Sequence, residues 1–312
     1  MTGYALRRVL GVVPVMAVVA LFVFGLLYVA GDPAAVLAGD KATPEQVEHI
    51  RVSLGLDQPF FIRFGHWIWR VLHGDLGTSI YTDQSVLLMI GQRVEPTLGL
   101  VVLTMIISIG IAVPLGVLAA WKRGTIIDRA MMVLSVLGFS VPVFVLGYVL
   151  AYWLAVRLDL LPAQGYAPLS AGIWAFLRHL ILPASALGLA YIALIARITR
   201  ASMLEVLSQD YVRTARAKGV LAGGVLFRHA LKNAANPIVT VIGIGVATLI
   251  GGTVVTETVF AIPGLGRLTV DAIAHRDYPV IQGVVLLFSA AFVLVNLATD
   301  LLYRLFDPRI RY

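Results

Sequence analysis

The side chains that could catalyse a covalent reaction are few in this sequence, and they are not grouped. The chain has no cysteine, which excludes a disulfide framework, a thiolate metal site and a cysteine nucleophile. Its six histidines include no His-Glu-x-x-His pair, and no Gly-x-Ser-x-Gly turn offers a serine nucleophile. No lysine follows a glycine, so a phosphate-binding loop is missing. The sequence therefore predicts a protein that is not an enzyme and carries no cofactor or metal of its own.

The composition predicts a chain that lies in a membrane. Of 312 residues, 59% are hydrophobic and 13% are charged, and the mean hydropathy is +0.91, whereas roughly a quarter of the residues in soluble proteins are charged. Six apolar stretches are long enough to cross a hydrocarbon core of about 30 Å. They are 9–30, 97–121, 130–156, 174–196, 237–256 and 280–302. We therefore expect an all-α integral membrane protein with six transmembrane helices and no nucleic-acid partner, despite the net charge of +7.

The basic residues predict the orientation of these spans, because lysine and arginine are enriched in cytoplasmic loops. With the N-terminus inside, Arg7 and Arg8 face the cytoplasm, together with Lys122, Arg123 and the basic segment 197–232. Most acidic residues then face outward, and both termini are cytoplasmic. The chain divides into an N-terminal segment with the first span (1–30), an outer amphipathic segment (31–96) and a core with five further spans (97–312).

The outer segment 31–96 is too long to be a simple connector. Thr43, Pro44 and Gln46 have the order of a helix start, with a threonine cap and a glutamine three residues later. The spacing of aromatic residues between Phe60 and Leu72 predicts an amphipathic helix in the membrane interface. This helix is either a structural belt or a surface for substrate or partner.

A second outer segment, between the last two spans, places charged residues next to a Pro-Gly turn at 263–264. A rigid turn beside a charged tip suits contact with a docked protein, and the alternative is a re-entrant plug packed on neighbouring helices. The candidate contact residues are Asp271, His275, Arg276 and Asp277.

The inner segment predicts a short surface helix over about 208–219. Ser208 is its expected cap, Asp210 suits the positive end of the helix dipole, and Gly219 suits a left-handed stop. Such a basic helix either rests on anionic membrane lipid or fits the groove of a cytoplasmic partner. The candidate residues for partner contact are Asp210, Tyr211, Arg213, Thr214, Ala215, Arg216, Ala217 and Gly219.

The fifth span carries small residues at four-residue intervals, a pattern that lets helices pack closely. The same face is alternatively a pore lining, with threonine hydroxyls turned toward a passing substrate, and a proline in the third span allows a kink. The candidates for translocation path or helix packing are Pro142, Thr240, Gly243, Ala247, Thr248 and Gly251. The spans hold almost no acidic residue near mid-depth, which disfavours an ion-coupled secondary transporter.

Several motifs in order resemble the B-type permease of ATP-binding-cassette importers for dipeptides, oligopeptides, glutathione and nickel. They are LGLDQP at 54–59, GDLG at 74–77, DYVRTARAKG at 210–219, FRHALKN at 227–233, FAIPGLG at 260–266 and RDYP at 276–279. Arg213, Thr214 and Ala215 stand where the general importer motif has Glu-Ala-Ala. That departure matches the peptide subgroup and removes the glutamate that could pair with an ATPase.

The resemblance implies a type I importer permease fold in the bacterial cytoplasmic membrane, with the helix at 208–219 coupling it to ATPase subunits. It implies a heterodimer with a second permease, two ATPase chains that bind ATP and Mg, and an extracytoplasmic substrate-binding protein. The expected cargo is a peptide. A nickel or other small chelate is the alternative that the same motifs allow.

Overall fold

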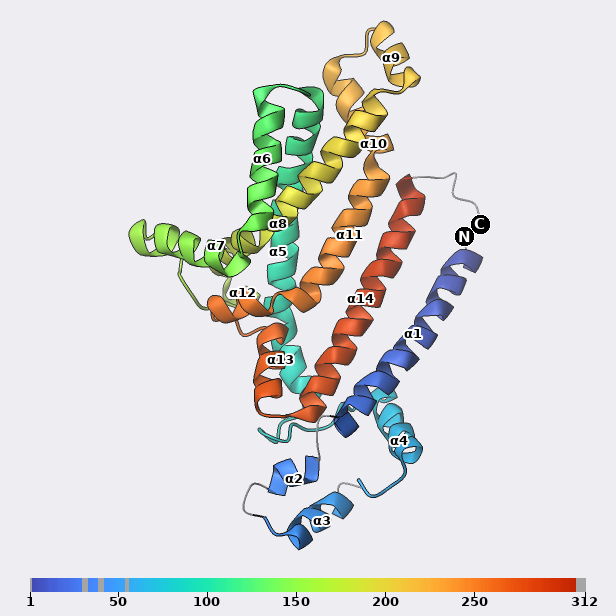
Figure 1. Cartoon of the computed structure of the whole chain (residues 1–312), viewed down its shortest axis with the longest axis vertical. Coiled ribbons are helices and arrows are strands. Elements are labelled where there is room, and N and C mark those ends of the chain that lie inside the picture. Colours follow the sequence, from blue (N-terminus) through green and yellow to red (C-terminus); the bar gives the residue numbers. More distant parts are fainter. Residues whose placement is uncertain (1, 30–32, 39–41, 54–55, 307–312) are drawn as a thin grey trace. The chain divides into compact units, whose positions relative to one another are not determined.

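The computed structural model describes residues 2–29, 33–38, 42–53 and 56–306, and Figure 1 shows the chain. Within these ranges nearly all regular structure is helical, apart from an isolated bridge between Thr78 and Ser85. The chain forms two compact units, each built from two segments. Unit 1 comprises Met1–Glu95 and Pro263–Val293, and unit 2 comprises Pro96–Ile262 and Leu294–Tyr312.

Unit 1 contains the N-terminal helices and the segment that leads into the last described helix. Its elements are α1 (Thr2–Val29), α2 (Pro33–Ala38), α3 (Pro44–Ser53), α4 (Phe60–Leu72), the start of α5 (Val86–Trp121), α13 (Leu265–Ala274) and the start of α14 (Tyr278–Phe306). The predicted start of α3 is confirmed as a capping box. The Gln46 side chain accepts a hydrogen bond from the Thr43 amide at 2.9 Å, and the Thr43 hydroxyl accepts one from the Gln46 amide at 3.4 Å.

Helix α4 is amphipathic, as the aromatic spacing predicts. Phe60, Phe64 and Trp67 surround Phe24 of α1, with ring centroids 5.3–5.5 Å from that of Phe24. Phe61, on another face, is 80% exposed. The buried face of α4 therefore packs on α1, which agrees with the structural belt, while the exposed apolar face suits the membrane interface.

Unit 2 contains the greater part of the helical core. Its elements are the rest of α5, α6 (Ile126–Ser140), α7 (Val143–Leu150), the π-helix η1 (Ala151–Arg157), the 3-10 turn η2 (Leu169–Ala171), α8 (Ile173–Leu207), α9 (Asp210–Ala217), the π-helix η3 (Gly224–Ala230), α10 (Leu231–Asn233), α11 (Ala235–Gly252), α12 (Val254–Val259) and the end of α14. Helix α8 packs against α6, α7 and α11. In Figure 1, α9 lies at the end of unit 2 where α5 turns into α6, and α12 lies toward the other end.

Four helices in the described residues are long and apolar enough to cross a membrane: α5, α8, α11 and α14. Helix α6 and the segment Val143–Arg157 form a fifth span if the bent pair counts as one. Helix α1 runs over 28 residues, but its described apolar stretch, Gly11–Gly25, is shorter than a span. The structure therefore supports four or five of the six spans, and the sixth stays a prediction.

The span expected at 130–156 is broken at the proline that was predicted to allow a kink. Helix α6 ends at Ser140, α7 begins at Val143, and the two segments are bent by 102°. The cause is Pro142, because a proline disfavours helical backbone at the residue before it. Val141 is accordingly extended, with φ −93° and ψ 124°. The span expected at 237–256 also ends early, since α11 stops at Gly252 and α12 follows as a separate helix.

Candidate functional site

Helix α9 follows α8 after only two residues. Its first residue is Asp210, and its N-cap is Gln209, which has extended backbone and makes no side-chain capping bond. The prediction that Ser208 caps this helix is wrong. Helix α8 continues to Leu207, and Ser208 is the cap at its C-terminal end, where its hydroxyl donates to the Glu205 carbonyl at 2.7 Å.

The other end of α9 is closed by backbone hydrogen bonds around a glycine. Gly219 has a φ of +82° and donates its amide to the Arg216 carbonyl at 2.9 Å. The Val220 amide donates to the Ala215 carbonyl at 3.2 Å. These two bonds form a Schellman motif, which requires a left-handed residue at the position that Gly219 occupies. The left-handed stop predicted from the sequence is therefore present.

Most of α9 faces solvent in this chain. Val212 is fully buried and anchors the helix, which packs against η3. Ala215 is partly buried, and the exposed residues are Asp210, Tyr211, Arg213, Thr214, Arg216, Ala217 and Gly219. Arg213 and Asp210 lie 3.8 Å apart, with side chains 80% and 98% exposed, and a pair this exposed contributes little to stability. The charges of α9 are thus available for contact with another surface.

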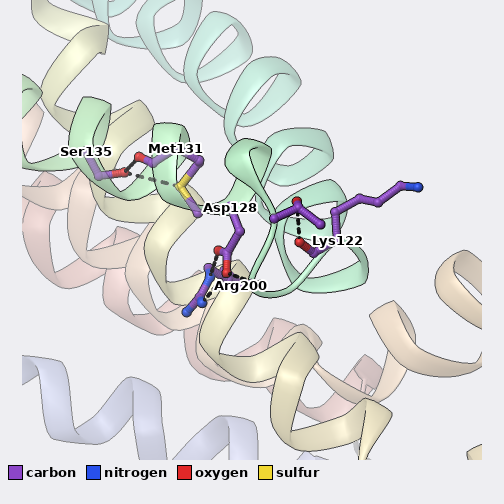
Figure 2. A network of polar contacts seen from close by, with 7 residues as sticks. Lys122, Asp128, Met131, Ser135 and Arg200 are labelled. Atoms are coloured by element: carbon purple, nitrogen blue, oxygen red, sulfur yellow. Dashed lines mark hydrogen bonds and ion pairs between the residues drawn. The ribbon is translucent and has the colours of Figure 1, made fainter.

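A buried ion pair lies in the helices that lead to α9 (Figure 2). Asp128, in the first turn of α6, accepts hydrogen bonds from two nitrogens of Arg200 in α8. The Arg200 Nε donates to Oδ1, and Nη2 donates to Oδ2 at 2.9 Å. The two side chains are 6% and 21% exposed. A bidentate arginine–carboxylate pair combines charge with fixed geometry, so it joins α6 firmly to α8.

The α11 residues predicted for path or packing divide into two groups. Gly243 packs against α14, because a Cβ added there would lie 2.3 Å from Thr299 Oγ1. Ala247 is also buried, whereas Gly251 has no atom within 4 Å of an added Cβ. Sequence reasoning missed a second close approach, at Gly245, where an added Cβ would lie 2.8 Å from Met105 Cε of α5.

The threonine hydroxyls on α11 are engaged within their own helix. The Thr240 hydroxyl donates to the Asn236 carbonyl and the Thr248 hydroxyl to the Ile244 carbonyl, each at 2.8 Å. Thr248 is exposed and Thr240 is partly buried. Gly243 therefore lies in a close contact between helices and Ala247 is buried, and Pro142 lies at the break between α6 and α7.

A buried carboxylate lies between α5 and α12 within unit 2. Glu257 is fully buried, and its Oε1 accepts hydrogen bonds from the Thr97 hydroxyl at 2.7 Å and the Thr253 hydroxyl at 2.8 Å. Glu257 directly follows the expected fifth span, 237–256, and the sequence gave no partner for it. The useful signal was an acidic residue at the edge of an apolar run, since such a residue needs hydrogen bonds when it is buried.

The four charged residues predicted to contact a docked protein do not share one environment. Asp271 in α13 and His275 and Arg276 just after it are exposed, and the His275 ring lies tilted against that of Tyr81 with 3.9 Å between ring centroids. Asp277 is 3% exposed. The placement of Asp277 on the exposed tip is therefore wrong, because Ser79 and Ile80 hold its carboxylate inside unit 1.

Within the described residues, no three His, Cys, Asp or Glu side chains are close enough together to hold a metal ion. Three of the histidines, His73, His179 and His275, each place Nδ1 2.8 Å from the carbonyl four residues earlier. Each of these rings thus contacts the preceding turn of its own helix.

The sequence matches two families along nearly its whole length. Residues 112–312 match the binding-protein-dependent transport system inner membrane component, and residues 1–101 match the N-terminal region of the same class of membrane component. The chain therefore belongs to the family of binding-protein-dependent transport system inner membrane components. It is a multi-pass inner-membrane transport component.

Individual relatives are similar over their full length. A probable peptide ABC transporter permease protein, y4tP of Sinorhizobium fredii, is 55% identical over 310 residues, which cover 99% of each chain. A putative peptide transport system permease protein of Brucella abortus is 46% identical over 313 residues, and the glutathione transport system permease protein GsiC of Salmonella typhimurium is 44% identical over 313 residues. Each of these two alignments covers 100% of both chains.

The fold also has a solved counterpart. The MetNI methionine ABC transporter, in an inward-facing conformation, aligns with a TM-score of 0.56 and 21% identity, covering 70% of this chain and 96% of that chain. At this identity the likeness concerns the fold. It identifies the type I importer permease fold that the motifs predicted.

Proposed function

We propose that this chain is one of two permease subunits of an ATP-driven peptide importer. The relatives named above as peptide and glutathione permeases support this proposal, because they match the chain from end to end. The second permease subunit, two ATPase chains that bind ATP and Mg, and an extracytoplasmic binding protein complete the proposed complex. Peptides are the proposed cargo, and membrane lipid surrounds the exposed apolar helices.

Helix α9 is the observation that carries the proposal. It is anchored by one buried residue, Val212, closed by the Schellman motif at Gly219, and otherwise turned to solvent. A helix held this way can enter a partner's groove without unfolding. The contact residues proposed for the ATPase are Asp210, Tyr211, Arg213, Thr214, Ala215, Arg216, Ala217 and Gly219.

The proposed orientation places α9 in the cytoplasm. Helix α9 and the α5–α6 turn lie at one end of unit 2 (Figure 1). This end carries Lys122 and Arg123 in the turn and Arg213, Arg216 and Lys218 around α9. A cationic end is typical of the cytoplasmic side. The opposite orientation would translocate these charges.

The outer contact proposed for the binding protein is limited to Asp271, His275 and Arg276, which are exposed. The proposed path includes Pro142 and α11, where the exposed residues Thr248 and Gly251 are the candidates to face cargo, and Thr240, Gly243 and Ala247 position the helix.

Co-purification and cross-linking test the proposal. The chain should bring down a second permease and two ATPases, and uptake in proteoliposomes should stop without ATP. Because the chain has no cysteine, Ala217→Cys is a single reactive site, and we expect it to cross-link to an ATPase. His275→Cys is the control and should not. Solute uptake by the purified chain alone, or a cross-link from position 275 but not from 217, would overturn the proposal.

A further inference from the structure

Asp128 and Arg200 have no part in the proposed docking surface, yet they connect the helices behind it. They are 72 positions apart, and their contact joins the first turn of α6 to the last third of α8. Both side chains are largely withdrawn from solvent. A buried charge left without its partner is strongly unfavourable, so the pair resists sliding of α6 along α8.

On one side of this pair, Asp128 also holds the α5–α6 turn. Its Oδ2 accepts a hydrogen bond from the Gly124 amide at 2.9 Å, and Gly124 has a φ of +80°. The Thr125 hydroxyl donates to the Lys122 carbonyl at 2.6 Å. One carboxylate thus closes the turn and binds Arg200 (Figure 2). A displacement of Arg200 therefore acts on the whole turn.

On the other side, Arg200 is connected to α9 by a short stretch of chain. It lies seven residues before Leu207, the end of α8, which is about 10 Å of continuous helix. Only Ser208 and Gln209 separate α8 from α9. Next to Arg200, Thr199 approaches Gly116 of α5 so closely that an added Cβ would lie 2.6 Å from Thr199 Cβ. Helix α8 therefore contacts both helices of the α5–α6 hairpin, and it does so close to the junction between α8 and α9.

We propose that the Asp128–Arg200 pair is the joint through which movement of α9 reaches the α5–α6 hairpin. The inference rests on the proposed docking of ATPases on α9. When α9 is displaced, α8 moves with it, and the bidentate pair carries α6 and the turn along as one body. Without the pair, the displacement is absorbed by sliding between α8 and α6. Asp128 and Arg200 are positioning residues, since they act on the pathway through the helices.

Uptake per ATP hydrolysed is the decisive measurement, made in the assembled complex in proteoliposomes. We expect Asp128→Asn and Arg200→Gln each to lower this ratio at least about fivefold, while ATP hydrolysis stays within about twofold. The double variant should lower this ratio no further than either single variant does, because each substitution removes the same ion pair. Arg197→Gln is the matched control: Arg197 is an exposed α8 arginine whose guanidinium lies over the Phe139 ring, and its loss should leave the ratio unchanged.

A distance measurement tests the joint without relying on transport. Spin labels on Arg123→Cys and Gln209→Cys report the separation of the turn from the α8–α9 junction, and both positions are exposed. We expect the same narrow distance distribution with and without ATP. Asp128→Asn should broaden it in the ATP-bound state. If the pair only stabilised the fold, Asp128→Asn would lower the thermal stability without this state-dependent broadening.

The outcomes separate the joint from the proposed function. An unchanged uptake ratio together with an unbroadened distance overturns the joint, even if Ala217→Cys still cross-links to an ATPase. Loss of that cross-link in the otherwise native chain overturns the docking of α9 instead. If a single variant fails to assemble, the double variant decides, because neither charge is then left buried without its partner. A wild-type ratio of uptake to ATP hydrolysis in the double variant would contradict the proposed role of the pair.

Discussion

Ser79 and Asp277, which are 198 positions apart, meet inside unit 1. The Ser79 hydroxyl donates to one oxygen of Asp277, and the Ile80 amide donates to the other at 3.1 Å. The Ser79 hydroxyl also accepts the Thr82 amide at 2.9 Å. The carboxylate therefore holds the turn before α5 against the corner that precedes α14.

Asp277→Ala is expected to destabilise the chain. Each lost hydrogen bond to a charged group contributes about 1.5–3 kcal/mol, and the substitution removes two of them. Thermal unfolding in detergent should show a clearly lower Tm. Arg276→Gln is the control, because Arg276 is exposed and next in sequence. It should keep the wild-type Tm and weaken the stimulation of ATP hydrolysis by the binding protein. An Asp277→Ala variant with unchanged Tm would show that the carboxylate is not a structural contact.

Gly219→Pro is expected to leave the protein inserted but to uncouple ATP hydrolysis from uptake. Proline fixes φ near −65° and has no amide hydrogen, whereas Gly219 has a φ of +82° and donates its amide to Arg216. The Schellman motif is then lost, and the shape of α9 changes. Ala215→Trp should have the same effect, since Ala215 is partly buried. Uptake and ATP hydrolysis measured in parallel check this prediction.

The control for Gly219→Pro is Gly223→Ala. Gly223 has a φ of −59° and no atom within 4 Å of an added Cβ, so alanine fits there without strain. It should preserve normal coupling. Normal uptake in both Gly219→Pro and Ala215→Trp would remove the assignment of α9 as the coupling element.

Local sequence signals predicted local features of the site. The glycine at 219 indicated a left-handed stop because few other residues tolerate that backbone, and Thr43 with Gln46 indicated a capping box. Pro142 indicated a kink. The 102° bend was not predictable, because its size depends on how α6 and α7 pack against α8.

Features that depend on distant residues were missed or misplaced. Ser208 lost its predicted role because α8 extends past the apolar run to Leu207. Asp277 is buried by a partner 198 positions away, which no local pattern indicates. Arg200 carried one available signal: an arginine that continues a long apolar helix needs a partner. The sequence did not identify that partner as Asp128.

Gly243→Ala is expected to destabilise unit 2. The added Cβ would lie 2.3 Å from Thr299 Oγ1 and 2.7 Å from its Cγ2, and overpacking of this kind costs about 1–3 kcal/mol. Gly251→Ala is the control, because nothing lies within 4 Å of its added Cβ, and it should not lower the Tm. Thr299→Ala combined with Gly243→Ala should recover part of the loss. Equal Tm values for the two single alanine variants would contradict the close approach of α11 and α14.

Glu257→Gln is expected to retain stability and ATP-driven uptake. Glutamine keeps an oxygen that can accept the Thr97 and Thr253 hydroxyls, which now donate to Oε1 at 2.7 and 2.8 Å. Glu257→Leu removes that acceptor in a fully buried place, and each buried polar group left unsatisfied costs about 1–3 kcal/mol. Tm and uptake should therefore fall with leucine and persist with glutamine. The contrary outcome is that Glu257→Gln loses uptake at unchanged Tm while Glu257→Asp keeps it. Because glutamine cannot carry an exchangeable carboxyl proton, that outcome would indicate that transport depends on a proton at this position.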